Sequence, residues 1–456
     1  MTIFVLLILQ HWEVYFMLNY MKKYLKGFYS TLIIYSILFF ILSVLLYFYE
    51  NHNANTQSNF FLLTTYQYGH ELFLLMIGSL LTLITISISL MMVVLTVYGA
   101  QFSPRTLQDF LASKKTLHIL GFLIGTLIYT ITSFFLLNNL SPNTKLISST
   151  IGTLLFIAAI FVFVYFIRFV SRSVQINLYV QELGKEILEE ISLKEATVLE
   201  NPNVHFKKDV KLLDVLGKDF IEIKSINNGY IKSYDNNKIV ELATISNAII
   251  LSKKQIGEYI FIDDVIFEIY KIDNVSEEFS NNLTSYVDIG AEPNLNNSLG
   301  FGTKKITEIA LRALPPTATD PATACFCIDQ LGETLKGITT ILAQVVYTDD
   351  QQNIRHVAQK ECFSRILFDH FAQIKLYGFN DVAIIKSTLT AFIKIAEKAE
   401  SNQNEELWKF TIFMLDKISF LDLHKYDYEL LISDLYKIAE LTSNQESFTK
   451  NFKKTT

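Results

Sequence analysis

The chain has 456 residues, and its charged side chains are distributed very unevenly along it. Residues 1–175 hold only nine of the 39 basic and four of the 45 acidic side chains, whereas a soluble domain usually carries about a quarter charged residues. This distribution excludes a single soluble globule. It predicts a membrane part followed by an ordinary soluble part.

Four long runs without Asp, Glu, Lys or Arg lie in the first part. A helix needs roughly 20 apolar residues to cross a bilayer core. The runs predict membrane-spanning helices at about 29–49, 73–97, 117–138 and 147–168, which form a four-helix transmembrane domain over 29–170. The apolar stretch before Glu13 is too short to span, so residues 1–28 are interpreted as a cytoplasmic or interfacial N-terminal segment.

The basic residues beside the spans predict the orientation of the chain, because short cytoplasmic loops carry an excess of Lys and Arg. Three basic residues precede the first span, the first loop has none, the second has three, the third has one, and two follow the fourth span. Both termini are therefore predicted in the cytoplasm. The spans contain no Asp or Glu, and no Lys or Arg at bilayer depth, which argues against an ion-coupled carrier.

The second span carries a stripe of small and weakly polar residues on one helical face. Its members are Gly78, Thr82, Thr85, Ser89 and Thr96. Such a stripe is typical of a pore or cavity lining, or of close packing between helices. Packing is the favoured interpretation, as it is for the GxxxG motif of Gly121 and Gly125 in the third span.

Two polar segments are predicted at the same cytoplasmic face of the membrane and should pack near each other as a mouth. They contribute Gln101, Ser103 and Arg105 after the second span, and Arg168, Arg172 and Gln175 after the fourth. Their arginines are expected to contact anionic lipid or the acidic soluble part.

The soluble part is predicted to be of the α+β class. A helical stalk at 171–200 continues from the fourth span, and a small β-module follows at 201–275, with one short helix near 238–246. The spacing of this module resembles half of a barrel-sandwich hybrid. A helical domain over 285–442 is expected to contain helices near 322–348, 355–377, 381–400, 404–420 and 426–442, before a flexible tail at 443–456.

A turn framed by prolines lies between two predicted helices of the soluble part. Its polar residues are Arg312, Thr319, Asp320 and Thr323. The turn is either a contact site for a small ligand or a capped helix boundary, with Pro in the first helical turn. The capped boundary is the favoured interpretation.

Recognisable catalytic and metal-binding motifs are absent from the sequence. Cys325 and Cys327 point about 200° apart on a predicted helix, so they are poorly placed to share a metal. Neither a phosphate-binding loop nor a hydrolase or zinc-protease motif occurs, and the acidic soluble part argues against nucleic acid. We therefore expect no cofactor, no metal and no enzymatic activity.

Several of these segments in combination resemble one bacterial family. They are Gln101-Phe-Ser-Pro-Arg105, Ser171-Arg-Ser-Val-Gln175, and Arg312-Ala-Leu-Pro-Pro-Thr-Ala-Thr-Asp-Pro-Ala-Thr-Ala324 followed by Cys327-Ile-Asp-Gln-Leu. The chain is similar over about residues 28–440 to the predicted membrane proteins catalogued as domain of unknown function 2254. The resemblance implies four N-terminal spans, a cytoplasmic C-terminal domain and a bacterial inner membrane location, but no activity. The chain departs from the family pattern at Glu292-Pro-Asn, Asn297 and Thr319.

Three hypotheses of function follow from the sequence. The preferred one is a channel- or transport-like homo-oligomer whose spans line a path gated by the cytoplasmic part. The alternative is a membrane-anchored sensor or scaffold that binds a cytoplasmic ligand or protein. A membrane-bound enzyme is least favoured, since no nucleophile–base pair or metal constellation is visible.

Overall fold

The protein was analysed as a computed structural model. It describes residues 28–52, 64–101, 113–140, 145–207, 219–271, 275–291, 299–316, 318, 320–342, 344–358, 362–416, 418 and 423–452. These residues form two compact units that divide between Gln175 and Ile176. The predicted N-terminal segment at 1–28 lies almost wholly outside the described residues.

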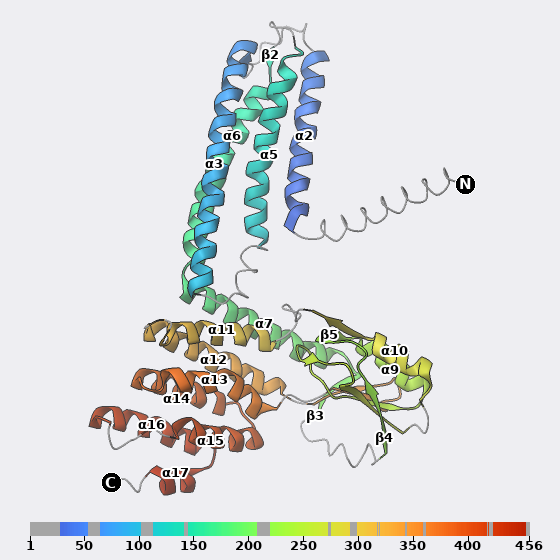
Figure 1. The fold of residues 1–456 in the computed structure, drawn as a ribbon, viewed down its shortest axis with the longest axis vertical. Coiled ribbons are helices and arrows are strands. Elements are labelled where there is room, and N and C mark those ends of the chain that lie inside the picture. Colours follow the sequence, from blue (N-terminus) through green and yellow to red (C-terminus); the bar gives the residue numbers. More distant parts are fainter. Residues whose placement is uncertain are drawn as a thin grey trace. The chain divides into compact units, whose positions relative to one another are not determined.

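Four apolar helices make up the first unit (Figure 1). They are α2 (Phe28–His52), α3 (Tyr66–Gln101), α5 (Lys114–Leu137) and α6 (Ser148–Ser173). All four are long and apolar enough to cross a membrane, which confirms that the four predicted segments are apolar helices.

Helix α5 is the centre of this bundle, because it packs against α2, α3 and α6. Half of its apolar window is buried, compared with 11% to 22% in the other three helices. Large side chains, including Phe73, Leu80, Leu123 and Tyr129, fill the interior and are fully buried. A short antiparallel pair of β1 (Thr64–Thr65) and β2 (Lys145–Leu146) completes the unit.

The second unit begins with α7 (Ile176–Glu200). The sequence predicted one continuous helix from the fourth span into this segment, but the structure ends α6 at Ser173. The Gln175 N–H donates to the Arg172 carbonyl, and such a tightened i−3 bond is common where a helix ends. The stalk is therefore a separate helix that belongs to the soluble unit.

Seven further helices stack with α7 in two layers (Figure 1). They are α11 (Leu299–Ala313), α12 (Pro321–Ile341), α13 (Phe363–Gly378), α14 (Val382–Ala396), α15 (Ser401–Leu415), α16 (Lys425–Leu441) and α17 (Gln445–Phe452). One layer runs α7–α12–α14–α16 and the other α11–α13–α15, and the short α17 packs against α16 at the end of the stack. Successive helices that alternate between two layers are typical of an α-solenoid.

Both ends of this helical stack differ from the sequence prediction. At the start, Val180, Leu183, Ile187 and Ile191 of α7 are buried, so the predicted stalk is part of the solenoid core. At the end, α17 lies in the segment expected to be a flexible tail, and its Phe448 is buried beside Tyr436 of α16. The Trp408 Nε1–H also donates to the Ser447 hydroxyl at 3.0 Å, so a buried ring and a hydrogen bond hold α17 on the stack.

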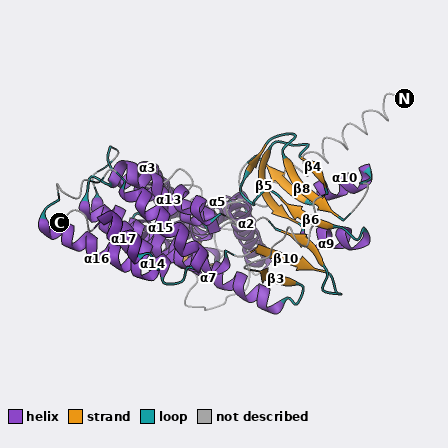
Figure 2. Cartoon of the chain, turned by 90° about the horizontal axis from the view of Figure 1, so that it is seen from below, coloured by secondary structure: helices purple, strands orange, loops and turns teal. Residues whose placement is uncertain are grey.

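Two sheets form the rest of the soluble unit, which Figure 2 shows from below with the strands in orange. Their strands are β3 (Val204–Lys207), β4 (Phe220–Lys224), β5 (Gly229–Tyr234), β6 (Ile249–Ser252), β7 (Tyr259–Ile260), β8 (Val265–Tyr270), β9 (Val287–Gly290), β10 (Gln344–Thr348) and β11 (Ile354–Val357). One sheet has the order β3-β10-β11-β6-β8-β4 and the other β7-β5-β9. Only β6 and β11 pair in parallel among the described strands.

The two sheets share one core with α9 (Asn236–Ile245) and α10 (Glu277–Ser285), built on residues such as Ile231, Ile239 and Phe267. The helix predicted near 238–246 is confirmed by α9. Strands β10 and β11 lie where the sequence predicted parts of two helices, and that prediction was wrong. Both segments are rich in β-branched residues and flank a polar turn, a pattern typical of a hairpin. The resemblance to a barrel-sandwich hybrid stays a prediction.

Candidate functional site

The polar stripe of the second span lies on the outside of the bundle. All five of its members, Gly78, Thr82, Thr85, Ser89 and Thr96, are exposed in the single chain. A Cβ at Gly78 would meet no other atom within 4 Å. No other described helix of the same chain covers the stripe. Whether the stripe packs against a helix of another molecule, or lines a pore or cavity, stays a prediction.

The stripe is the midline of the outward face of α3. The buried side chains of this helix are those of Phe73, Met76, Leu80, Ser87, Met91, Val94 and Tyr98. At about 100° per residue, they centre on the face opposite the stripe. Leu75, Met92 and Val93 flank the stripe and are 70%, 60% and 61% exposed. No other described part of the chain covers this face.

The three threonine hydroxyl groups of the stripe donate inside α3 itself. Thr82 donates to the Gly78 carbonyl (3.0 Å), Thr85 to the Leu81 carbonyl (2.8 Å) and Thr96 to the Met92 carbonyl (3.0 Å). A hydroxyl bonded in this way needs no external acceptor, while its oxygen keeps lone pairs for water or another molecule. The stripe can therefore face either apolar groups or water.

The GxxxG motif behaves differently from the stripe. A Cβ at Gly121 would lie 2.7 Å from the ring of Tyr35, and a Cβ at Gly125 would lie 3.0 Å from the ring of Phe39 and 3.3 Å from the Tyr35 carbonyl oxygen. These two glycines let α2 approach α5 closely. The packing interpretation of this motif is confirmed.

A buried carboxylate joins the first span to the fourth. Glu50 of α2 accepts hydrogen bonds from the backbone N–H groups of Ile147 and Ser148, both at 2.6 Å, and from the Ser148 hydroxyl at 3.1 Å. These donors open α6, whose own N-cap residue offers no side-chain bond. Negative charge is favoured at this end of a helix. This contact could not be predicted from the sequence, because no local pattern links residues about 100 positions apart.

Only some residues of the predicted cytoplasmic mouth lie in the part of the chain that the structure describes. Gln101 is the last residue of α3, and Ser103 and Arg105 lie outside the described residues. At the end of α6, Arg168, Arg172 and Gln175 are exposed.

One hydrogen bond links the two helices that would form this mouth. The Tyr98 hydroxyl donates to the Ser173 carbonyl at 2.8 Å. The C-terminal ends of α3 and α6 therefore lie side by side. The contact expected between residues 105 and 172 stays a prediction.

The turn framed by prolines is a capped helix boundary. Asp320 is the N-cap of α12, with Pro321 at the helix start. Its two carboxylate oxygens accept from the Thr323 N–H (3.2 Å) and the Thr323 hydroxyl (2.7 Å). Arg312 lies in the last turn of α11, where a cation favours the helix dipole, and Thr319 is outside the described residues. Capping thus accounts for Asp320 and Thr323, and a ligand at this turn stays a prediction.

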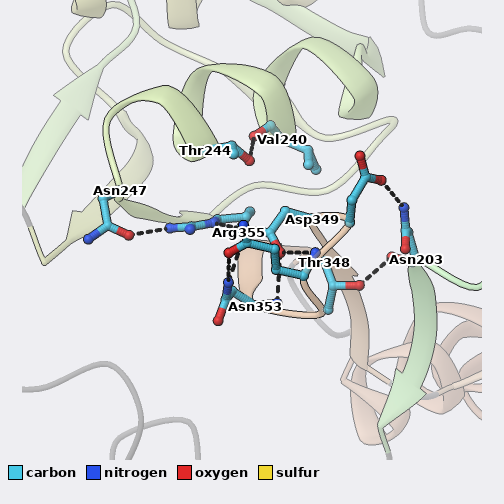
Figure 3. A network of polar contacts seen from close by, with 10 residues as sticks. Asn203, Val240, Thr244, Asn247, Thr348, Asp349, Asn353 and Arg355 are labelled. Carbon is cyan, nitrogen blue, oxygen red and sulfur yellow. Dashed lines mark hydrogen bonds and ion pairs between the residues drawn. The ribbon is translucent and has the colours of Figure 1, made fainter.

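A polar network that the sequence analysis did not predict joins three segments of the soluble unit (Figure 3). Arg355 of β11 pairs with Asp349 (Nε to Oδ2, 2.8 Å) and donates to Asn247 after α9 (Nη1 to Oδ1, 2.8 Å). The Thr348 N–H donates to the carbonyl of Asn203, which follows α7. Burial alone would raise the pKa of Asp349, but hydrogen bonds from Arg355 and Asn353 outweigh it and lower the pKa to about 2.

A buried Ser–His pair lies beside this network. The Nε2 atom of His356 is 2.8 Å from the Ser252 hydroxyl, and Tyr347 stacks on the imidazole ring. Burial lowers the pKa of His356 to about 3, and its Nδ1 atom has no hydrogen-bond partner among the described residues. A nucleophilic pair needs access to substrate and a group that orients the base. This pair is therefore part of the core.

The described residues contain no group of three or more His, Cys, Asp or Glu placed to hold a metal ion. Burial raises the pKa of the Cys327 thiol to about 12, and such a thiol is not reactive at neutral pH.

The four spans and the soluble helical and sheet unit define an integral membrane protein. Residues 26–394 match the family described as predicted membrane protein (DUF2254), and the chain belongs to this family. Uncharacterized proteins of Mycobacterium tuberculosis (strain H37Rv) and Mycobacterium bovis are similar to it. Each is 23% identical over 335 residues, which cover 70% of this chain and 62% of the relative. The match thus spans less than two thirds of the length of these relatives. No solved structure matches.

Proposed function

We propose that this chain is a channel- or transport-like protein of the bacterial inner membrane, in which the spans of several copies line a path for ions or small solutes. The observation that carries the proposal is the position of the polar stripe on the outside of a packed single-chain bundle. The soluble unit would regulate the path from the cytoplasm.

The path is proposed between copies because the bundle of one chain is filled. Phe73 and Tyr129 occupy the interior around α5 and are fully buried. Gly152 of α6 approaches both of these rings, since a Cβ there would lie 3.0 Å from Phe73 and 3.3 Å from Tyr129. An assembly in which α3 helices face a common axis would place Thr85 and Ser89 on that axis.

The orientation in this proposal places both termini in the cytoplasm. The basic residues of the short loops support it, as do the exposed Arg168 and Arg172 at the end of α6. Arginines at this position suit the anionic headgroups of a cytoplasmic leaflet.

Flux through reconstituted vesicles tests the proposal. Thr85→Leu and Ser89→Leu should reduce ion or solute flux, because each replaces a hydroxyl on the path by a bulky apolar group. Ile88→Leu is the matched control, since Ile88 is 47% exposed on the same helix but lies away from the midline of the stripe. Absence of flux in the unmodified protein under every gradient and tension applied would contradict the proposal, as would equal losses in all three variants.

A membrane-anchored scaffold is the second candidate, and the two-layer helical stack favours it. Solenoids present extended surfaces on which partners bind. We infer that the sheets, interpreted as related to half of a barrel-sandwich hybrid, act as a structural adaptor in this role. A binding fragment must start at Ile176, because α7 supplies buried residues to the stack. A folded fragment 176–456 that retains no cytoplasmic protein would contradict the scaffold.

A further inference from the structure

Two neighbouring loops of the sheet domain expose large apolar side chains at one tip. Ile226 in the β4–β5 loop is 67% exposed, and Phe261 and Ile262 in the β7–β8 loop are 62% and 53% exposed. The ring of Phe261 contacts Tyr259, which contacts Tyr230 in turn. The tip therefore continues an aromatic row that is anchored in the three-stranded sheet.

Backbone hydrogen bonds hold the two loops together. The Ser225 N–H donates to the Asp264 carbonyl (2.8 Å), and the Asp263 N–H donates to the Ser225 carbonyl (2.9 Å). The Ile262 N–H donates to the side-chain oxygen of Asn228 (2.7 Å). These bonds fix the conformation in which Ile226, Phe261 and Ile262 are exposed. They also satisfy backbone groups that would otherwise oppose entry into an apolar phase.

The charges beside the tip give it no net basic surface. Lys254 pairs with Glu258 and Asp264, both at 3.2 Å, and Lys253 pairs with Glu268 at 2.8 Å. Asp263 is exposed at the tip itself. Attraction to anionic groups therefore contributes little, and the burial of apolar area is the available driving force.

We propose that this tip, formed by Ile226, Phe261 and Ile262, inserts into the surface of the bilayer that holds the spans. The occupant is lipid for two reasons. The three large apolar side chains are exposed together on two hydrogen-bonded loops, and exposed apolar patches mark sites of membrane or protein interaction. The chain is also permanently attached to a bilayer through α6, so a lipid surface is present at high effective concentration. The inference does not depend on a channel function.

Tryptophan fluorescence of the full chain in vesicles tests the inference. Phe261→Trp and Ile262→Trp are compared in phosphatidylcholine vesicles with and without brominated acyl chains, after subtraction of the signal of the parent protein. Phe161→Trp on α6, a candidate membrane span in which Phe161 is 70% exposed, is the positive control. Ile245→Trp on α9 is the negative control, since Ile245 is 78% exposed outside the tip.

The inference predicts that brominated lipid quenches the Phe261→Trp, Ile262→Trp and Phe161→Trp proteins at least twofold more than the Ile245→Trp protein. Adding Ile226→Asp to Phe261→Trp should remove most of the quenching, whereas 0.5 M salt should leave it unchanged. Quenching at Phe161→Trp without quenching at the tip would overturn the inference. A blue-shifted emission at the tip that brominated lipid does not quench would also overturn it, because protein would then cover the tip.

Discussion

Glu50 and Ser148 lie 98 positions apart in the sequence, yet the carboxylate of Glu50 accepts two hydrogen bonds from Ser148, one from the backbone and one from the hydroxyl. The first span thereby supplies the N-terminal cap of the fourth. The Tyr129 hydroxyl donates to the Ser148 carbonyl at 2.7 Å, so α5 is joined at the same point. Helices α2, α5 and α6 are therefore joined by hydrogen bonds at the N-terminal end of α6.

The first prediction concerns this contact. Glu50→Ala should lower the free energy of unfolding of the bundle by about 1.5–3 kcal/mol, because hydrogen bonds to a charged acceptor are lost and helix N–H groups are left unpaired. Thermal unfolding in detergent measures the change. Glu71→Ala is the control, since Glu71 is exposed on α3. Equal effects of the two substitutions would contradict the capping role of Glu50.

The second prediction separates the two glycine environments of the spans. Gly125→Val should destabilise the bundle by about 1–3 kcal/mol, as overpacking does, because the new side chain would meet Phe39 and the Tyr35 carbonyl oxygen. Gly78→Val has open space and should change the stability of the isolated chain by less than about 0.5 kcal/mol. Both are measured by thermal unfolding. A larger loss of stability from Gly78→Val, measured in a detergent that keeps the protein monomeric, would contradict the exposed position of this face of α3.

The third prediction is a pH dependence of the soluble unit. Burial lowers the pKa of His356 and of His370 to about 3, below the ordinary value of about 6.5. Between these two values the unfolded state binds more protons than the folded state, so stability falls as the pH falls from about 6.5 towards 3. Each histidine contributes a slope of up to about 1.4 kcal/mol per pH unit.

His356→Gln tests this dependence. The variant should unfold with a shallower pH dependence between pH 6.5 and 4, although it is less stable at neutral pH. His205→Gln is the matched control, because His205 lies on β3 and is partly exposed. An unchanged slope in the His356→Gln protein would contradict the account.

The fourth prediction concerns the ion pair of Asp349 and Arg355. Arg355→Met leaves a buried carboxylate without its partner and should destabilise the soluble unit strongly. The double variant Asp349→Asn with Arg355→Met should recover part of the loss, because no unpaired charge then remains. A double-mutant cycle from chemical unfolding measures the coupling. Strictly additive losses would show that the two side chains act independently.

Much of the membrane part was predictable from the sequence, because a span needs only a long apolar run. The stripe could also be recognised by helical spacing. The sequence could not predict whether the stripe faces into or out of the bundle. Helical periodicity places residues on one face but does not say whether a neighbouring helix covers that face. Only the opposite position of Phe73 and Leu80, which are buried, settles that the stripe points outward from the single chain.

The soluble part was predicted less well, and two elements show why. The hairpin of β10 and β11 was mistaken for helix, although Gln344-Val-Val-Tyr-Thr is a β-branched run and the Asp349–Asn353 segment is a turn signal. The surrounding helical periodicity outweighed these local signals. The break between α6 and α7 carries neither Gly nor Pro, so no residue marks it in the sequence.

Reaction of introduced cysteines with a membrane-impermeant, water-soluble thiol reagent tests the proposed path most directly. Thr85→Cys and Ser89→Cys are placed in reconstituted protein that carries Cys325→Ala, Cys327→Ala and Cys362→Ser, with Ile88→Cys as the control. The proposal predicts rapid labelling at 85 and 89 and slow labelling at 88, because only the midline of the stripe would face water. Equally slow labelling at all three positions would place the stripe in lipid or in a dry contact and would contradict a conducting path.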